Sequence, residues 1–198
     1  MAKLYFTFGT MGSSKTAQAL IQRFSFIERG KKVLFLKPSI DTRDGEFILK
    51  SRIAGLEAPV ETYKADENII DKFNMKLIDM DCIIVDEVQL STATQIEELR
   101  YIVDELNIMV YTYGLRVNFK SLLFEGSKRL MELADEIRDI ETPCHCGRKT
   151  IVNARYRGKK VLYEGEDIVI GGNNMYKSLC YKCFREGNLD ISKEKGEK

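Results

Sequence analysis

The sequence lacks long hydrophobic runs, and it lacks a large excess of either charge. Met1-Ala2-Lys3 leads into an apolar run of about five residues before the first glycine, which is too short for the core of a signal peptide or for a membrane span. Lysine and arginine together number 31 against 30 acidic residues, and a net charge of +1 provides no field for a polyanion such as DNA. We therefore expect a cytoplasmic protein that contacts neither membranes nor nucleic acids.

The chain is long enough for one full core and a small appendage, because it has 198 residues of which 44% are hydrophobic. Its five cysteines are not expected to form disulfides in a reducing compartment. A pattern among them would therefore reflect metal binding or chance. Cys82 stands inside an apolar run and is expected to behave as a small apolar residue.

A glycine-rich loop, Gly9-Thr10-Met11-Gly12-Ser13-Ser14-Lys15-Thr16, follows the first apolar run and opens a segment with helical periodicity. A strand, a tight loop and a helix start direct backbone N–H groups and the positive end of a helix dipole at one point, where phosphate binds favourably. Lys15 would reach the outer phosphates, and the Thr16 hydroxyl would ligate Mg²⁺. The loop thus predicts nucleotide binding, and an ordinary Gly/Ser-rich turn is the alternative.

Ser14 departs from the usual P-loop pattern G-x-x-x-x-G-K-[ST], because it stands where the second glycine belongs. A glycine at that position keeps side-chain bulk out of a crowded backbone turn. A serine would either tilt the loop and weaken nucleotide binding or be accommodated there, and the sequence leaves both outcomes open.

Apolar runs alternate with amphipathic stretches along the first part of the chain. We expect helices and strands, in chain order, at residues 4–8, 17–27, 33–36, 82–85, 96–106 and 108–111. This order predicts an α/β fold with a P-loop NTPase-like, mostly parallel sheet flanked by helices. Residues 39–65 show no clean period, and we expect them to form a loop over the nucleotide face.

Asp86 and Glu87 directly follow the strand expected at 82–85, at the carboxyl end where open α/β sheets gather ligands. In P-loop proteins an acid at this point steadies Mg²⁺, a role that Asp86 would take. Glu87 would point the other way along an extended chain, so it could face a second substrate and accept the proton of an attacking hydroxyl. A solvated turn is the alternative, and the glycine loop in the same chain favours the functional interpretation.

The motifs Cys144-His145-Cys146 and Cys180-Tyr181-Lys182-Cys183 are two close pairs of cysteines separated by a span that could form a hairpin. Four thiolates complete a closed tetrahedral zinc shell, which is structural rather than catalytic. The first pair has one intervening residue instead of the common two, so free buried thiols or a redox pair are the alternatives. His145 could replace a cysteine as a ligand, but we expect it to be an exposed bystander.

A composition shift near Thr142-Pro143 predicts a domain boundary, after which glycines, basic residues and the two cysteine pairs accumulate. We therefore expect a P-loop nucleotide-binding α/β domain at 1–141 and a small zinc-binding domain at 142–190. The tail at 191–198 is nearly all charged or glycine from Lys193 on, and we expect it to be disordered.

With these elements together, the chain resembles the thymidine kinases that combine a P-loop with a zinc-binding domain. The resemblance covers nearly the whole chain. It rests on the glycine loop and on Asp41-Thr42-Arg43, Val85-Asp86-Glu87-Val88-Gln89, Tyr113-Gly114-Leu115-Arg116 with Phe119 and Phe124, Cys144-His145-Cys146-Gly147, and Ile170-Gly171-Gly172 with Tyr176 and Cys180. In such enzymes ATP gives its γ-phosphoryl to the 5′-hydroxyl of thymidine or deoxyuridine, and the products are the monophosphate and ADP.

The resemblance implies a role for each matching residue. Gly9 to Thr16, Asp86 and Gln89 would bind ATP, Thr16 and Asp86 would hold the magnesium ion, and Glu87 would be the base. The zinc ligands would be Cys144, Cys146, Cys180 and Cys183. The residues that would contact the nucleoside are Met11, Arg43, Leu90, Leu115, Phe119, Phe124, Val169, Ile170, Gly171 and Tyr176. Many relatives have an aromatic residue in place of Leu90, so one stacking surface would be weaker here.

The segment around Val169, Ile170 and Gly171 belongs, in the family, to a loop of the zinc domain that closes over the base and reads it largely with backbone groups. Zinc would tie down both ends of this loop before the substrate arrives. A small closed pocket with main-chain readout would also exclude purines by volume. The family further implies a homotetramer and inhibition by the triphosphate end product, dTTP.

Two other functions stay open. One is a nucleic-acid-stimulated P-loop ATPase with a zinc ribbon, in which Asp86 and Glu87 would position water, although the near-neutral charge speaks against it. The other is a nucleotide sensor without turnover, which Ser14 would favour. We expect an active enzyme, because Lys15, Thr16, Asp86 and Glu87 all keep the chemistry of the family.

Overall fold

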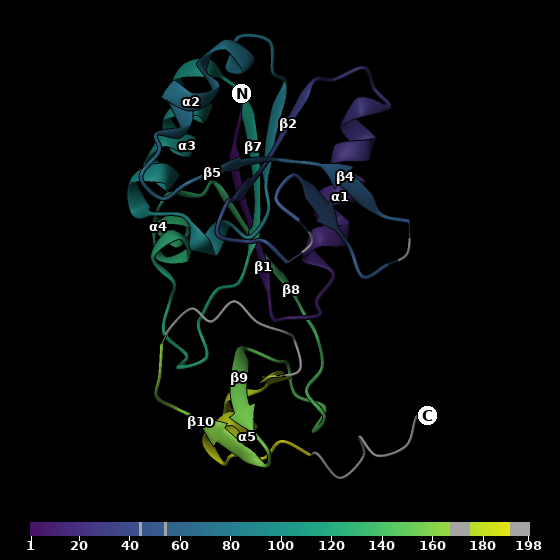
Figure 1. Cartoon of the computed structure of the whole chain (residues 1–198), viewed down its shortest axis with the longest axis vertical. Coiled ribbons are helices and arrows are strands. Elements are labelled where there is room, and N and C mark those ends of the chain that lie inside the picture. Colours follow the sequence, from purple (N-terminus) through teal and green to yellow (C-terminus); the bar gives the residue numbers. More distant parts are fainter. Residues whose placement is uncertain (44, 54, 167–174, 191–198) are drawn as a thin grey trace.

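The computed structural model describes residues 1–43, 45–53, 55–166 and 175–190. A six-stranded sheet with the order β5-β2-β6-β7-β1-β8 forms the centre of its larger part (Figure 1). Every pairing in this sheet is parallel. Its strands, in chain order, are β1 (Leu4–Gly9), β2 (Val33–Pro38), β5 (Glu61–Tyr63), β6 (Cys82–Val85), β7 (Met109–Gly114) and β8 (Glu136–Ile140).

Helices cover both faces of this sheet, which confirms the expected α/β class (Figure 1). One face carries α1 (Lys15–Ile27), and the other carries α2 (Ile69–Leu77), α3 (Ala93–Leu106) and α4 (Glu125–Leu133). In β6, Ile83 and Val85 enter the core shared with α2, α3 and α4, whereas Cys82 and Ile84 enter the core under α1. A strand buried on both faces therefore needs a continuous apolar run, and Cys82 is a buried core residue as expected.

Residues 39–65 are not the loop that we expected. They contain an antiparallel hairpin of β3 (Ile48–Lys50) and β4 (Glu57–Pro59), and then β5 at the edge of the parallel sheet. Leu49 and Ala58 are the buried middle residues of the two hairpin strands and pack in the core under α1. Strands of three residues are too short to produce a recognisable period, which explains the wrong prediction.

A smaller unit follows β8. Its strands β9 (Val152–Arg157), β10 (Lys160–Leu162) and β11 (Tyr176–Leu179) form an antiparallel sheet with β9 in the middle, and the short helix α5 (Tyr181–Arg185) follows. Its core is separate from those of the α/β part and contains three of the four paired cysteines. We call residues 142–190 the cysteine unit; the domain boundary near Thr142 stays a prediction.

Three strand ends define the position of the site. β6, β7 and β1 are neighbours in the parallel sheet, so their carboxyl ends lie along one edge. The glycine loop leaves β1 there, and Asp86 and Leu115 directly follow β6 and β7. None of the helices within the described ranges has the length and apolar character needed to cross a membrane. The tail at 191–198 and the positions Val169, Ile170 and Gly171 lie outside the described residues.

Candidate active site

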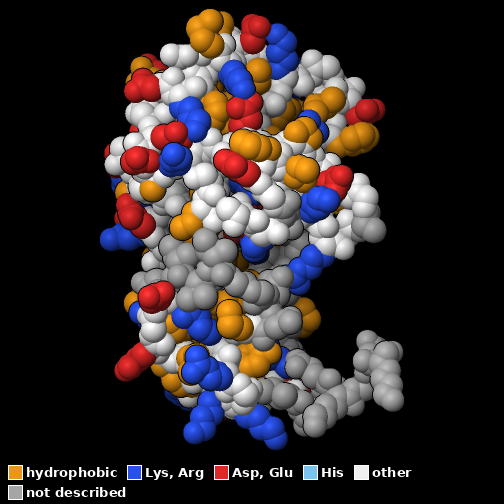
Figure 2. All heavy atoms as spheres, in the orientation of Figure 1, with side chains coloured by type: hydrophobic (Ala, Val, Ile, Leu, Met, Phe, Trp, Pro, Cys, Tyr) orange, Lys and Arg blue, Asp and Glu red, His pale blue; other side chains and the backbone are white. Residues whose placement is uncertain are grey.

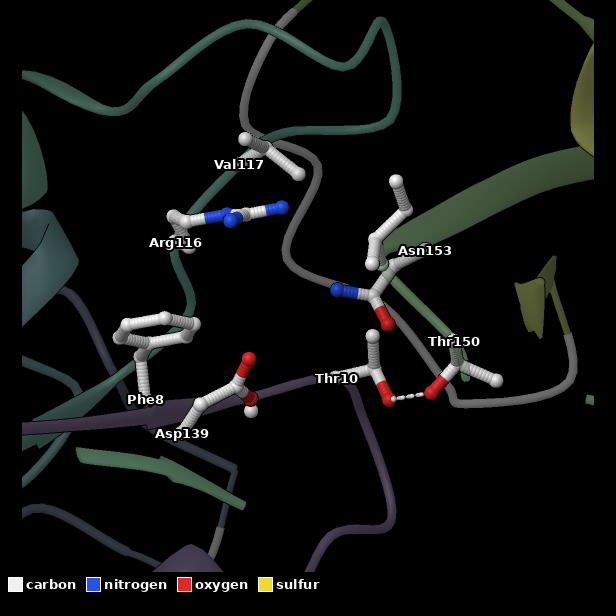
Figure 3. A pocket seen from close by; sticks show the side chains of 9 residues that line it. Phe8, Thr10, Arg116, Val117, Asp139, Thr150 and Asn153 are labelled. Carbon is white, nitrogen blue, oxygen red and sulfur yellow. Dashed lines mark hydrogen bonds between the residues drawn. The ribbon is translucent and has the colours of Figure 1, made fainter. Parts of the chain in front are cut away.

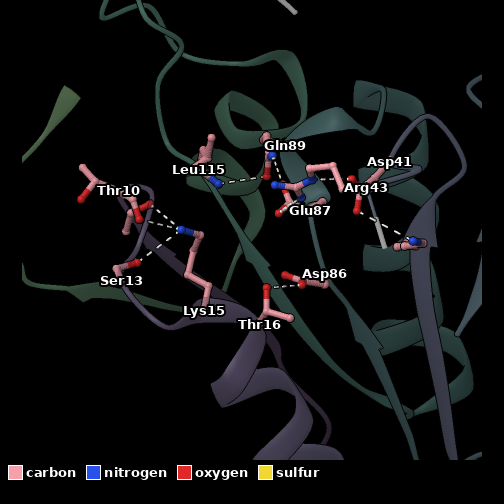
Figure 4. A network of polar contacts seen from close by, with 12 residues as sticks. Thr10, Ser13, Lys15, Thr16, Asp41, Arg43, Asp86, Glu87, Gln89 and Leu115 are labelled. Atoms are coloured by element: carbon pink, nitrogen blue, oxygen red, sulfur yellow. Dashed lines mark hydrogen bonds and ion pairs between the residues drawn. The ribbon is translucent and has the colours of Figure 1, made fainter. Parts of the chain in front are cut away.

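The glycine loop connects β1 to α1, as the sequence predicts, and its shape depends on two glycines (Figure 4). At Gly9 a Cβ atom would lie 2.4 Å from Ser13 Oγ, so this position has no room for a side chain. Gly12 has a φ of +81°, which residues with a Cβ rarely adopt. Residues 9–16, called the phosphate loop below, therefore form a tight turn directly before a helix N-terminus.

Ser14 is the residue before α1, and its backbone is left-handed, with φ 64° and ψ 21°. Its carbonyl accepts the first helical hydrogen bond, from Gln18 N at 3.0 Å. The side chain of Ser14 is exposed. The usual glycine is therefore favoured here by backbone conformation and not, as we expected, by the need to exclude side-chain bulk.

Lys15 folds its ammonium group into the phosphate loop. Nζ donates to Gly9 O at 3.0 Å, to Thr10 O at 2.8 Å and to Ser13 Oγ at 3.3 Å. Burial lowers the pKa of Lys15, and the nearby carboxylates of Glu87 and Asp86 act in the opposite direction. The chain thus places a cation where the loop would hold the outer phosphates of a nucleotide.

Asp86 and Thr16 meet beside the loop. Thr16 Oγ1 donates to Asp86 Oδ2 at 2.8 Å, while the buried Asp86 Oδ1 has no hydrogen-bond partner among the described residues. Burial, and after it the charge of Glu87, raises the pKa of Asp86 to about 7. A hydroxyl oxygen beside an unpartnered carboxylate oxygen is a donor set that suits Mg²⁺, so these two residues fit the ion.

We expected Glu87 to continue an extended chain, but its backbone is left-handed, with a φ of 52°. The carboxylate is held from two sides: Arg43 Nη2 donates to Oε1, and Gln89 Nε2 donates to Oε2 at 2.6 Å. Arg43 Nε in turn donates to Asp41 Oδ1 at 2.6 Å. Glu87 is thereby fixed at the strand edge, across the site from Lys15 (Figure 4).

Gln89 belongs to the short helix η1 (Val88–Leu90) and links it to the end of β7. Its Oε1 accepts from Leu115 N at 2.9 Å, and a Cβ atom at Gly114 would lie 2.5 Å from the same oxygen. The Leu115 carbonyl accepts from Ser127 Oγ at 2.6 Å. Gln89 therefore lies beside Glu87 and Leu115, and it positions both.

The residues expected to contact the nucleoside come from both parts of the chain. Phe119 is 2% exposed, and the guanidinium of Arg155 lies over its ring with Cζ 3.8 Å from the centroid. Arg155 also donates to Tyr176 Oη, which brings Tyr176 to the same place. Phe124 directly precedes α4, and Leu90 ends η1.

The phosphate loop also touches the cysteine unit. Thr10 Oγ1 lies 2.9 Å from Thr142 Oγ1 and 2.8 Å from Thr150 Oγ1. Met11 N donates to Asn153 Oδ1 at 2.7 Å, so this amide of the loop faces the cysteine unit. A small cleft lies beside these contacts (Figure 3), and its lining residues are Phe8, Gly9, Thr10, Arg116, Val117, Asp139, Thr150, Ile151 and Asn153.

The four paired cysteines converge as predicted, with their sulfur atoms within 4.8 Å of one another. The Sγ atoms of Cys146 and Cys180 are 3.5 Å apart, and tetrahedral zinc with bonds of about 2.3 Å needs sulfur separations of about 3.8 Å. The cluster therefore fits a zinc ion. His145 is exposed, as expected, although its ring nitrogens lie 3.6 Å from Cys144 Sγ and 3.5 Å from Cys183 Sγ.

Three residues of the site region were not singled out from the sequence: Lys37, Asn153 and Arg155. Each is a buried polar or charged residue inside a strand, with 0%, 4% and 7% exposure. A polar residue within an apolar run is the signal that could have pointed to Lys37, which interrupts the run before Pro38. Asn153 and Arg155 lie on a mixed strand and gave no such signal.

Comparison with known proteins agrees with this geometry. A family model described as thymidine kinase matches residues 2–184. A thymidine kinase of Jannaschia sp. (strain CCS1) is 41% identical over 194 residues, which cover 96% of this chain and 99% of the relative. A thymidine kinase of Shewanella oneidensis is 39% identical over 189 residues, covering 94% and 98%.

Among solved structures, Pif1 of Bacteroides bound to single-stranded DNA matches 70% of this chain and 38% of its own, with a TM-score of 0.42 and 15% identity, a likeness too weak to support a conclusion. The family model and the relatives span nearly the whole chain. On that evidence, the chain belongs to the thymidine kinase family.

Proposed function

We propose that the protein transfers the γ-phosphoryl group of ATP to the 5′-hydroxyl of thymidine or deoxyuridine in pyrimidine salvage. The observation behind this proposal is that the Lys15 ammonium, the Thr16–Asp86 pair and the Glu87 carboxylate gather at the carboxyl ends of β1 and β6 (Figure 4). An ion-binding pair, a phosphate-binding cation and a proton acceptor on one edge are the groups that phosphoryl transfer needs.

In the proposed step, the 5′-oxygen of the nucleoside attacks the γ-phosphorus of ATP. The new P–O bond forms as the bond to the β,γ-bridging oxygen breaks, so ADP leaves and the proton of the hydroxyl passes to a Glu87 oxygen. Arg43 and Gln89 hold the two oxygens of Glu87 and keep it directed at the reaction centre. Because such a transition state is loose, positioning contributes more than basicity.

The phosphate loop and Lys15 would hold the triphosphate of ATP, with Thr16 and Asp86 on Mg²⁺. Bound there, Mg²⁺ would neutralise charge on the β- and γ-phosphates. We propose Met11, Leu90, Leu115, Phe119, Phe124 and Tyr176 as walls of the pyrimidine pocket. We also propose a structural zinc ion on the four paired cysteines, since their spacing supports it.

The remaining proposals rest on family membership. They are a homotetramer, feedback inhibition by dTTP, a cytoplasmic location, base readout by Val169, Ile170 and Gly171, and the division into domains at 1–141 and 142–190.

The proposal is tested by measuring ADP release from MgATP with and without thymidine. Thymidine-dependent release that yields thymidine monophosphate supports it. Release that depends on single-stranded DNA would identify the ATPase alternative instead, and binding of ATP without release under either condition would identify a nucleotide sensor.

Glu87→Gln is expected to lower kcat by about two orders of magnitude, because a positioned base contributes that much. The variant keeps the shape of the side chain, so binding of MgATP, measured by calorimetry, should stay close to that of the parent protein. Glu57→Gln, at an exposed position of β4, is the matched control and should leave kcat unchanged. An unchanged kcat in Glu87→Gln would remove Glu87 from the role of base.

A further inference from the structure

Arg155 is a charged side chain buried where the cysteine unit meets the α/β part of the molecule. It lies on β9, the middle strand of the small sheet, and only 7% of its surface is exposed. A buried guanidinium is costly unless its donors are satisfied. The partners of Arg155 therefore indicate what the residue does.

The contacts of Arg155 join three segments of the chain. Nε and Nη2 donate to Tyr176 Oη at 3.0 and 2.7 Å, and Nη1 donates to Glu166 O at 2.9 Å. The flat face of the guanidinium lies on the ring of Phe119, with Cζ 3.8 Å from the centroid. Phe119 follows β7 in the α/β part, whereas Tyr176 begins β11 in the cysteine unit.

We propose that Arg155 is a positioning residue for the nucleoside site, because it fixes Phe119 and Tyr176 relative to each other. This inference rests on the proposed thymidine kinase function, which assigns these two aromatic residues to the walls of the pyrimidine pocket. A pocket that discriminates a small planar base needs its walls in place before the base arrives. Arg155 supplies this by holding one wall through stacking and the other through hydrogen bonds.

The guanidinium suits this role better than an ammonium would. It is planar, it carries its donors in a fixed fork, and it stacks on an aromatic face while it donates in its own plane. Lysine has neither the plane nor the fork. The contacts of Arg155 given above include no group of the phosphate loop and not Glu87, so its loss should affect nucleoside binding before it affects ATP.

The test compares substrate dependence in matched variants. Arg155→Met is expected to raise KM for thymidine about tenfold or more, with little change in KM for ATP and with the parent's zinc content. Arg155→Lys should resemble Arg155→Met. Arg157→Met, two residues further along β9 at an exposed position, is the control and should keep the parent's KM for both substrates.

Two further measurements separate positioning from general stability. Tyr176→Phe removes only the hydroxyl, so it should raise KM for thymidine. Adding Arg155→Met to Tyr176→Phe should then raise KM for thymidine by a smaller factor than Arg155→Met does in the parent. Guanidinium at millimolar concentration should lower KM for thymidine in Arg155→Ala and leave the parent unaffected. An unchanged KM for thymidine in Arg155→Met, or a parallel loss for both substrates without rescue, would overturn the inference.

The failure of this inference is distinguishable from that of the proposed function. A parent protein that does not phosphorylate thymidine would overturn the function. If the parent is active but Arg155→Met leaves KM for thymidine unchanged, or impairs the use of both substrates in parallel without rescue by guanidinium, only the role of Arg155 is overturned. If Arg155→Met does not fold, Tyr176→Phe decides, and an unchanged KM for thymidine in that variant contradicts the proposal.

Discussion

Ser14 shows at the scale of one residue how a motif can be altered without losing its geometry. The loop keeps its turn, and the helix begins at the expected place, although a residue with a Cβ adopts a left-handed backbone. Such a conformation costs about 1 kcal/mol for an L-residue other than glycine. We therefore expect the departure from the family pattern to affect the stability of the protein more than the shape of the phosphate loop.

Ser14→Gly is expected to increase the free energy of unfolding by about 0.5 to 1 kcal/mol, since the relief of strain exceeds the entropy that glycine adds to the unfolded chain. The melting temperature should rise by about 1 to 4 °C. Thermal unfolding of Ser14→Gly and of the control Ser14→Ala measures this, and the alanine variant should show no gain. Equal melting temperatures in the glycine variant and the parent would contradict the strain argument.

Lys37 is a second residue whose importance appears only in the structure. It is fully buried at the end of β2, and Nζ donates to Gly45 O at 2.8 Å and to Ile48 O at 3.2 Å. The same ammonium lies 3.9 Å from Asp41 Oδ2. Asp41 holds Arg43, which holds Glu87, so the buried cation stands at the start of a chain of contacts that ends at the proposed base.

Lys37→Met is expected to reduce the free energy of unfolding by about 3 kcal/mol, because it leaves the carbonyls of Gly45 and Ile48 without their donor and removes one of the two cations beside the buried Asp41. Urea titration measures this loss. Asp41→Asn added to Lys37→Met removes the buried carboxylate that has lost one of its two cations, and it should recover part of the stability but not the activity, because Arg43 loses its charged partner. A fully stable Lys37→Met variant would contradict this account.

At the scale of elements, the strands that are buried on both faces were predictable and the edge elements were not. β2, β6 and β7 read as continuous apolar runs because both of their faces meet helices. β8 was missed, since its residues are half-exposed or exposed and its sequence, Glu-Ile-Arg-Asp-Ile, resembles a surface turn. β5 and the strands of the hairpin, β3 and β4, were missed for another reason, since each has only three residues.

The candidate site was predictable where the residues share one strand edge or one motif. The phosphate loop, Asp86 and the cysteine pairs could be named because each follows from a local pattern. Arg155 and Asn153 could not be named, because their roles depend on contacts with other segments. Arg155 contacts Tyr176 and Phe119, and Asn153 contacts Met11. Contacts between distant segments leave no periodic trace in the sequence.

The contacts between the phosphate loop and the cysteine unit join the two parts of the molecule for which we propose different ligands, ATP and zinc. Asn153 Oδ1 accepts from Met11 N at 2.7 Å, and Ser178 Oγ donates to Met11 O at 2.8 Å. Both groups of the Met11 backbone are thus held by the antiparallel sheet of the smaller unit. The conformation of the loop should depend on that sheet.

Asn153→Ala is therefore expected to raise KM for ATP about fivefold, although Asn153 lies outside the phosphate loop, because the partly buried N–H of Met11 loses its partner. Initial-rate kinetics with varied MgATP measure the change, and zinc content should stay the same. Asn188→Ala, at an exposed position of the same unit, is the control. If KM for ATP does not change, the loop keeps its shape without Asn153.

At the scale of the whole molecule, one surface is unusually apolar. On α1, Ile21, Phe24 and Ile27 are 52%, 61% and 42% exposed and share one side of the helix. Figure 2 shows further hydrophobic side chains over the region of α1 and β4. Contiguous exposed apolar surface of this kind marks contact with another protein surface, and it supports the proposed self-association.

Phe24→Glu is expected to lower the mass of the assembly that the protein forms in solution, because it places a charge in the middle of this surface. Light scattering after size-exclusion chromatography measures the mass over a range of concentrations. Met75→Glu, on α2 at a residue that is 77% exposed, is the control and should not change the mass. If the mass is the same in Phe24→Glu and in the parent, α1 takes no part in assembly.

The order of strands in the sheet has a consequence for synthesis. β1 is made first, yet it lies between β7 and β8 in the sheet. On the ribosome, β2 and β6 can therefore pair before β7 and β8, the two neighbours of β1, have been translated. The phosphate loop directly follows β1, so a nascent chain that ends before Met109 should not yet bind ATP.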